Sequence, residues 1–261
     1  MREWWAQQGF RSFTFPSNVS PYFPAQEWEE ARRTLPEDVF RQEYMAEFLE
    51  DSAGVFRGVD GCLIAGGAGA GAETCPNVIV GCDVAKHTDW TVCVAVDART
   101  GRCLEMERFN QLDWPVQRER IAAFARRWRA RLVMDATGIG DPVFDDLCRV
   151  LPQVEGFKIT GNSKRELVQG LMVAVEQRRV SWPVSWDVMT AEMKRYEYEI
   201  GPTGQVSYSA PSGYHDDCVM ALALAVWGMK TFGTGPGLML RLSGDGGSRS
   251  EVGRRRTLTL A

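Results

Sequence analysis

The stretch NVIVGCDVAKHTDWTVCVAVD, residues 77–97, decides the fold. A short apolar run ends on Asp83, the chain turns through polar residues, and a second apolar run covers residues 90–97. Short valine-rich runs bounded by turn residues are typical of buried strands. We therefore expect a hairpin of two strands, at 77–83 and 90–97, with a carboxylate at the end of the first.

Two later segments also place carboxylates at the edge of an apolar element. The segment RLVMDATGIGD predicts a strand that ends at Asp135. The segment YHDDCVMALALAVW predicts a helix that opens at Asp216 and Asp217. This helix is apolar nearly all round, which indicates a central and buried position.

The order of the elements between residues 77 and 231 predicts an α/β fold. Antiparallel strands come first, and strands alternating with helices follow. After the hairpin we expect strands at 102–110, 132–135, 154–159 and 205–209, and an extended piece at 180–183. We expect helices at 115–129, from the 136–142 loop to Leu147, from a cap at Asn162 or Ser163 onward, from Trp186 to Tyr196, and at 215–229. This order predicts a mixed central sheet with helices on both faces.

The N-terminal part is organised differently. Residues 1–24 are aromatic and turn-rich, and two short helices are expected at 25–35 and 36–49. The run GGAGAGAE lies within 51–76, where we expect a flexible linker. It lacks the lysine and the strand-to-helix context of a phosphate-binding loop. The expected domains are therefore 1–50, the linker 51–76, a globular domain at 77–231, and a disordered Gly-, Ser- and Arg-rich tail at 232–261.

The composition is that of an ordinary globular protein. The chain has 261 residues, 44% hydrophobic and 25% charged, with a net charge of −4. This charge excludes a general basic coat, so any DNA binding must rest on local patches. The longest apolar run is too short to cross a bilayer, and the first residues lack the apolar region of a signal peptide. The seven scattered cysteines indicate buried thiols in a reducing compartment rather than disulfides or zinc ligands.

Two clusters of arginines stand out against this acidic background. One lies in the tail at 254–256, and the other lies along the helix expected at 115–129 and just after it. For the second cluster the spacing favours the solvated face of an amphipathic helix. Its members are Arg118, Arg120, Arg126, Arg127, Arg129 and Arg131.

The aspartates at the three element edges suggest a metal site. Taken singly, each has an ordinary explanation as a turn residue or a helix-start residue. If the strands ending at Asp83 and Asp135 are neighbours, both carboxylates leave the same edge of the sheet, and the central helix can bring Asp216 and Asp217 there. Carboxylates this close repel unless a cation neutralises them. Oxygen ligands favour Mg²⁺ or Mn²⁺ over zinc, and two such ions about 4 Å apart would support phosphodiester hydrolysis.

Two residues beside these aspartates are candidates for supporting roles. Lys86 follows the first strand, and His215 directly precedes the paired aspartates. Either side chain would hold a phosphate or tune a water at the metal, or else act as a local hydrogen-bond partner.

In their order, these motifs resemble a known family. Asp83 with Asp89 six residues on, VMDATGIGDP around Asp135, and YHDD at the head of an apolar helix resemble the C-terminal nuclease domain of tailed-phage terminase large subunits. That domain has a ribonuclease H-like fold, and the resemblance covers roughly residues 77–231. LPEDVFRQEYMAEFLEDSAGVF is similar to the segment that links the family's packaging ATPase to its nuclease. Residues 1–24 resemble the end of that ATPase.

The resemblance implies a metal-dependent endonuclease that cuts concatemeric viral DNA during genome packaging. Asp83, Asp135 and one or both of Asp216 and Asp217 would be metal ligands, with Asp89 as a supporting acidic residue. The implied partners are double-stranded DNA, a portal protein, a small terminase subunit and further copies in a ring, in the host cytoplasm and without a membrane. The chain carries no Walker A motif. We therefore expect a fragment of a longer protein or a split gene, with nuclease activity only.

Three alternatives remain open at this point. An actin-like ATPase or sugar kinase also opens with a strand ending in Asp, but its turn is glycine-rich where this chain has Lys-His-Thr-Asp. A module that docks on DNA or on a portal without cutting would retain the same motifs. A resolvase or transposase would share the ribonuclease H-like fold.

Overall fold

A central mixed sheet organises the molecule. The computed structural model describes residues 13–47, 54–65, 75–85, 89–138, 140–200 and 206–233. Within them, a five-stranded sheet has the strand order β4-β3-β2-β5-β6. β2 (Val78–Asp83), β3 (Thr91–Asp97) and β4 (Cys103–Phe109) are antiparallel neighbours, whereas β5 (Arg131–Asp135) is parallel to β2 and to β6 (Val154–Phe157). The predicted mixed sheet is confirmed.

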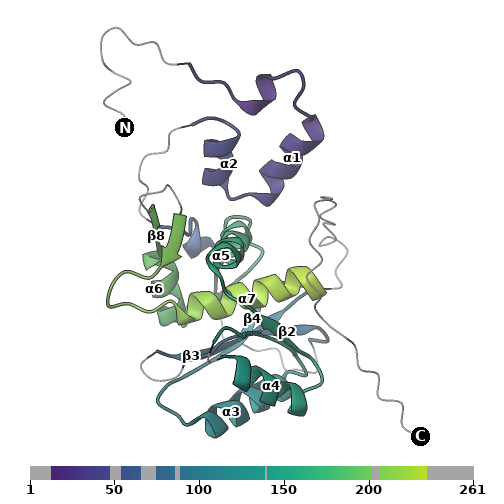
Figure 1. Ribbon diagram of the computed structural model, residues 1–261, viewed down its shortest axis with the longest axis vertical. Helices are drawn as coiled ribbons and strands as arrows, with labels where there is room; N and C mark the ends of the chain where they lie inside the picture. Colours follow the sequence, from purple (N-terminus) through teal and green to yellow (C-terminus); the bar gives the residue numbers. More distant parts are fainter. Residues whose placement is uncertain are drawn as a thin grey trace, which may run out of the picture.

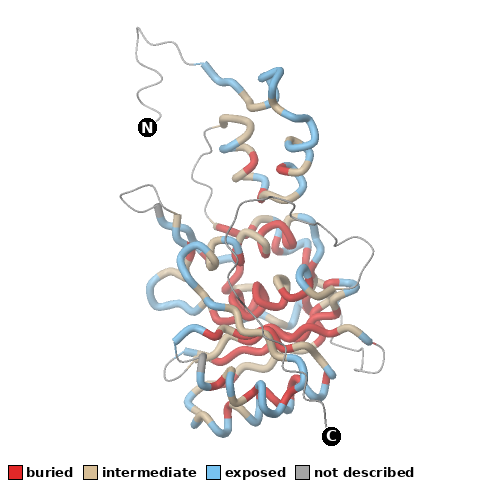
Figure 2. The backbone as a smooth tube through the Cα atoms, turned by 45° about the vertical axis from the view of Figure 1, so that its right-hand side comes forward, coloured by how far each residue is buried: buried red, intermediate tan, exposed pale blue. Residues whose placement is uncertain are grey.

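Helices cover both faces of this sheet (Figure 1). α3 (Trp114–Arg127) and α4 (Gly140–Val150) lie on one face, and α5 (Gly161–Glu176) and α7 (Asp217–Phe232) lie on the other. Successive strand residues point to opposite faces. Ile79 and Val133 accordingly pack in the core beneath α7, whereas Val80 and Leu132 pack in the core beneath α3 and α4. Figure 2 shows the buried residues concentrated along the sheet and the helices against it.

α7 lies directly against the sheet because glycines stand where the elements cross. A Cβ on Gly81 would come within 2.0 Å of the Ala221 carbonyl oxygen, and a Cβ on Gly228 would come within 2.7 Å of Ile79 Cγ2. Real Cβ atoms do not approach other atoms so closely, so only glycine permits this separation of helix and strand. The close approach keeps the helix central and buried along most of its length, as its apolar sequence predicts.

Smaller elements complete the described structure. These are the 3-10 helices η2 (Ser17–Val19) and η3 (Val59–Cys62), the parallel pair β1 (Leu63–Ile64) and β7 (Trp182–Pro183), α6 (Asp187–Arg195), and the antiparallel pair β8 (Glu197–Ile200) and β9 (Val206–Ser209). The strand predicted at 205–209 is confirmed as β9, while residues 201–205 lie outside the described residues.

Part of the expected flexible linker is packed, so that expectation is wrong for residues 54–65. Val55, Phe56 and Cys62 are buried in the core shared with α5 and α7. β1, which follows them, pairs with β7. The physical reason is that these apolar side chains gain more from burial than a solvated linker could offer. Residues 66–74, which include the glycine run, lie outside the described residues.

The cap of α5 also differs from the prediction. Thr160, rather than Asn162 or Ser163, is the N-cap residue. Its hydroxyl accepts the Ser163 N–H at 3.2 Å, and Ser163 Oγ accepts the Thr160 N–H at 2.7 Å. This reciprocal capping box satisfies two backbone donors and starts the helix at Gly161.

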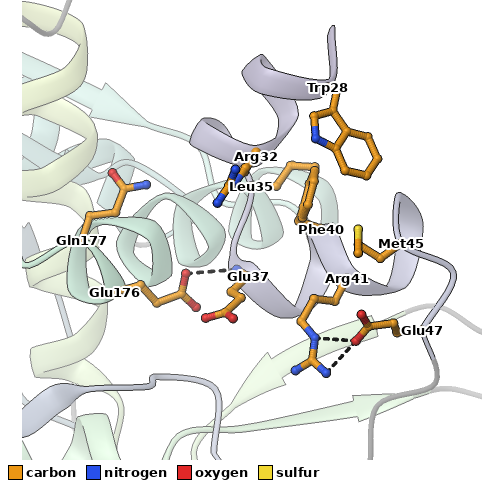
Figure 3. Close-up of a pocket in the computed structure, with 10 residues that line it drawn as sticks. All are labelled: Trp28, Arg32, Leu35, Glu37, Phe40, Arg41, Met45, Glu47, Glu176 and Gln177. Atoms are coloured by element: carbon orange, nitrogen blue, oxygen red, sulfur yellow. Dashed lines mark hydrogen bonds and ion pairs between the residues drawn. The ribbon is translucent and has the colours of Figure 1, made fainter. Parts of the chain in front are cut away.

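Two helices precede the domain and contact it through α5. α1 (Ala25–Thr34) and α2 (Glu37–Glu43) were both predicted, the second with a longer range. Glu176 Oε2 accepts the Glu37 N–H at 3.1 Å, and Gln177 Nε2 donates to the Arg33 carbonyl at 3.1 Å. A cavity of about 540 Å³, lined in part by Trp28 and Glu176, lies between these elements (Figure 3).

The structure bears on two expectations from the composition, the burial of the cysteines and the lack of a membrane-spanning helix among the described residues. Six of the seven cysteines are buried free thiols, and Cys148 is exposed, in line with the prediction of mostly buried thiols. Among the described helices, none combines the length and the apolar character that crossing a membrane requires.

Candidate active site

The carboxyl ends of β2 and β5 lie side by side and carry Asp83 and Asp135. The parallel register pairs Cys82 with Met134, so each aspartate directly follows a paired residue. The residues two positions earlier in each strand contact α7. Because side chains alternate along a strand, both carboxylates lie on the α7 side of the sheet.

The start of α7 brings two further carboxylates to this edge. Asp216 is the N-cap residue and Asp217 the first residue of the helix. Asp217 Oδ2 accepts the backbone N–H of Trp90 at 3.3 Å, which joins the start of α7 to the segment entering β3. The deep packing of α7 on β2 therefore determines where both aspartates lie.

Electrostatics shows that the predicted aspartates form one cluster. Burial raises the pKa of Asp83 well above its usual value, and the carboxylates of Asp217, Asp135 and Asp216 raise it further, whereas Lys164 lowers it. Like charges act on a pKa in this way only when they are near. The structure thus brings together the side chains that the sequence places at three separate element edges.

His215 and Asp89 lie beside this cluster. His215 Nδ1 is 3.5 Å from Asp89 Oδ1 and 3.6 Å from Asp217 Oδ2. Burial raises the pKa of Asp217 to about 6; the Trp90 N–H and His215 oppose the increase, and Asp216 and Asp89 add to it. Lys86, the other predicted supporting residue, lies outside the described residues.

Two neighbours of Asp216 were not predicted from the sequence. Lys164 Nζ, in α5, lies 3.3 Å from Asp216 Oδ2. Tyr196, after α6, is buried, and burial, the charge of Asp216 and a hydrogen bond with that carboxylate raise the pKa of its hydroxyl. The sequence does carry a signal for Lys164. This lysine lies near the start of the helix that follows β6, and the carboxyl end of β6 lies at the same edge of the sheet as Asp83 and Asp135. Tyr196 is one aromatic residue of an amphipathic helix pattern, which carries no such signal.

The residues fit a hard divalent cation by their chemistry, although they do not form a ready cage. Carboxylate oxygens are the ligands that Mg²⁺ and Mn²⁺ prefer. Asp135 Oδ1 accepts the Thr137 N–H at 2.8 Å, while Asp216 and Asp217 keep the lysine and histidine contacts described above. Within the described part of the chain, no three His, Cys, Asp or Glu side chains converge closely enough to hold an ion. Metal binding would therefore require the carboxylates to move closer together.

The arginine-rich face of α3 is neutralised by ion pairs. The pairs join Arg118 to Glu119 and Asp146, Arg120 to Glu107, and Arg127 to Glu105 and Glu107. Arg126 donates to the Val150 carbonyl, and Arg131 stacks on Phe232. This arrangement supports the interpretation as a solvated helix face. The tail cluster at 254–256 lies outside the described residues.

Known proteins share this sequence pattern and this fold. The model of the family described as the terminase RNaseH-like domain matches residues 80–227. The terminase large subunit of Thermus virus P23-45 is 30% identical over 214 residues, which cover 76% of this chain and 43% of that protein. The chain thus matches less than half the length of this curated relative.

Solved structures agree with the assignment of the fold. The large terminase nuclease from thermophilic phage G20c with bound magnesium has a TM-score of 0.59 and 24% identity, covering 68% of this chain and 98% of that chain. The same nuclease with bound cobalt has a TM-score of 0.60, with the same identity and coverage. The predicted ribonuclease H-like fold is confirmed.

Proposed function

This chain belongs to the family of terminase RNaseH-like domains, and we propose that it is a divalent-metal-dependent endodeoxyribonuclease that cuts concatemeric viral DNA during genome packaging. The observation that carries the proposal is the meeting of Asp83, Asp135, Asp216 and Asp217 at one edge of the sheet. Four carboxylates in a partly buried place are costly for stability alone, which points to a role in binding a cation.

Mg²⁺ or Mn²⁺ would be held by these carboxylates, and a pair of ions is the expected occupancy. When bound, the metal would supply the positive charge that lowers the pKa of a water and offsets charge developing on a phosphodiester. The support consists of the oxygen donor set, the effect of each carboxylate on the pKa of Asp83, and the magnesium and cobalt bound by the related nuclease.

The protein's own cations have complementary roles in this proposal. Lys164 neutralises Asp216 before metal binds, and it then becomes available to contact a phosphate oxygen of the duplex. His215 Nδ1 lies near both Asp89 Oδ1 and Asp217 Oδ2, so a protonated imidazole would attract both carboxylates.

The family also supports proposals about the surroundings of the nuclease. We place it in the host cytoplasm, with double-stranded DNA as substrate, a portal protein and a small terminase subunit as partners, and a ring of copies during packaging. Residues 1–50 would be the end of an ATPase domain and a helical linker. The family assignment replaces the alternatives of an actin-like ATPase or sugar kinase and of a resolvase or transposase. A module that docks without cutting is left as the competing function.

Plasmid cleavage tests the proposal against that competitor. Supercoiled plasmid is incubated with the 261-residue chain in Mn²⁺, in Mg²⁺, or in EDTA. Nicking and linearisation that require either metal are the expected result. Cleavage that persists in EDTA would contradict metal dependence. Binding of plasmid without cleavage, measured by gel shift in both metals, would favour the docking module instead.

A further inference from the structure

The first turn of α7 is held from behind by a residue of α6. Glu192 Oε2 accepts the backbone N–H of Cys218 at 2.8 Å, and Cys218 directly follows Asp217. The N–H groups of a first turn have no partner within the helix, and a carboxylate there is favoured by the helix dipole. Asp216, the N-cap residue, makes no side-chain capping hydrogen bond. Glu192 therefore supplies from another helix the acceptor that the cap residue does not.

The stability of the fold alone does not explain a carboxylate at this position. The Glu192 side chain is only 8% exposed, and the nearest cation, Arg108 Nη2, lies 4.0 Å from its Oε1. That oxygen has no hydrogen-bond partner among the described residues. A buried carboxylate with one unsatisfied oxygen costs free energy, and apolar residues of similar size pack more cheaply. Such an exception calls for a role in the neighbouring site.

The contacts of Glu192 close a ring around Asp217. The Arg108 guanidinium lies over the Trp90 ring, 3.8 Å from its centroid. The Trp90 N–H in turn donates to Asp217 Oδ2 at 3.3 Å. The carboxylate of Asp217 is thus held by Trp90, while its neighbour Cys218 is held by Glu192. Four elements, β3 with its entering segment, β4, α6 and α7, meet in this ring.

We propose that Glu192 is a positioning residue of the nuclease site, which holds the first turn of α7 so that Asp217 presents its carboxylate to a divalent cation. The inference rests on the proposed function and adds a residue that lies behind the predicted ligands. Glu192 acts through the Cys218 N–H rather than by touching metal or DNA. Loss of such a supporting contact changes metal affinity or activity by about 10- to 100-fold.

Substitutions at Glu192 separate its hydrogen bond from its charge. Glu192→Gln keeps an oxygen that can accept the Cys218 N–H. Glu192→Asp keeps the charge but is one methylene too short to reach that N–H, and Glu192→Ala removes both. The matched control is Thr190→Val on the same helix, because the Thr190 hydroxyl hydrogen-bonds Trp182 and Trp186 rather than α7.

Two quantities are measured for each variant. The first is the thermal midpoint of the 261-residue chain as Mn²⁺ is added in the absence of DNA. The second is the Mn²⁺ concentration that gives half-maximal plasmid cleavage. A ligand that binds only the folded state raises the midpoint as its concentration passes the Kd. For Glu192→Asp and Glu192→Ala we expect both Mn²⁺ responses to move to about 10-fold higher concentration. Glu192→Gln should stay within about 3-fold of the original chain, because its hydrogen bond is retained. Thr190→Val should lower the metal-free midpoint without moving the Mn²⁺ response.

Several outcomes would overturn this role. A shift in Glu192→Gln that is absent from Glu192→Asp would assign the effect to charge, and an equal shift in Thr190→Val would assign it to loosening of α6. Unmoved responses in every Glu192 variant would show that the residue is not needed for positioning. If Glu192→Ala does not fold, the comparison of the Gln and Asp variants still decides. An original chain that shows neither a Mn²⁺ response nor cleavage overturns the proposed function itself, a result distinct from the others.

Discussion

Asp83 and Asp135 stand at the ends of neighbouring parallel strands, each directly after one member of the Cys82–Met134 pair. The sheet register therefore places two carboxylates side by side, and the N-terminus of α7 adds two more. Partial burial and mutual repulsion make their ionised forms costly. In the metal-free protein the ionised carboxylates therefore destabilise the folded state.

The first prediction concerns pH and the stability of the metal-free protein. The pKa of Asp217 is raised from 3.8 to about 6, so the folded state holds this proton more tightly than the unfolded state. The resulting stabilisation is fully present below about pH 4 and is lost as pH rises through about 6. It amounts to about 3 kcal/mol in total, of which about 1–1.5 kcal/mol is lost between pH 5 and pH 7.5.

Urea unfolding in EDTA at these two pH values checks this, with Asp217→Asn as the comparison. The variant keeps an oxygen for the Trp90 N–H but cannot ionise, so its free energy of unfolding should depend less on pH and exceed that of the original chain at pH 7.5. The same pH dependence in both proteins would contradict the account.

The second prediction concerns Lys164 as a substitute for a bound cation. Lys164→Ala removes the partner of Asp216 and should lower the free energy of unfolding in EDTA at pH 8 by about 1 kcal/mol, since the pair is partly buried. Saturating Mn²⁺ should reduce this difference in the free energy of unfolding between Lys164→Ala and the original chain. Lys230→Ala, at the exposed far end of α7, is the control. A loss that is equally large in EDTA and in Mn²⁺ would show that Lys164 acts only as a structural residue.

The third prediction concerns the crossing of β2 and α7. Gly81→Ala should destabilise the protein by about 3 kcal/mol or prevent folding, because its Cβ would meet backbone atoms of α7 at 2.0 and 2.5 Å. Gly161→Ala is the matched control, since a Cβ there has no atom within 4 Å. Thermal unfolding followed by circular dichroism compares the two. Similar midpoints would mean that α7 does not lie this close to the strand.

The fourth prediction concerns the attachment of α1 and α2. A carboxylate at the C-terminus of α5 is disfavoured by the helix dipole, but Glu176 gains the N–H of Glu37. Glu176→Ala should therefore increase amide hydrogen exchange in 25–43 by about 10-fold, as a net loss of about 1–1.5 kcal/mol implies. Glu166→Ala, exposed on the same helix, should leave that exchange unchanged. Exchange that is unaltered in Glu176→Ala would show that the contact does not hold the helices.

The sequence predicted the sheet and the aspartate cluster because both depend on local patterns. The valine-rich runs on either side of Asp83 specify strands, and the all-round apolar helix after Asp217 has only the centre of the domain to occupy. The family resemblance then assigned the fold, and the family model and the solved structures confirm it.

The contacts that hold the cluster were not predictable in the same way. Lys164 meets Asp216 from 52 positions away, and Glu192 meets Cys218 from 26 positions away. Both contacts depend on how whole helices pack, which no local spacing encodes. The burial of Val55, Phe56 and Cys62 was missed for the same reason, because these side chains find their partners in elements distant in sequence, such as α5, α7 and Tyr196.

The most direct test of the nuclease site is plasmid cleavage in Mn²⁺ by Asp135→Ala, measured beside Asp145→Ala, an exposed aspartate of α4. We expect Asp135→Ala to lose more than about 100-fold in cleavage, because even the loss of a residue behind a metal ligand costs about 10- to 100-fold. Its circular dichroism spectrum should be unchanged, and the control should cleave like the original chain. Full cleavage by a folded Asp135→Ala protein would show that the chemistry lies elsewhere in the chain and would overturn the proposed nuclease site.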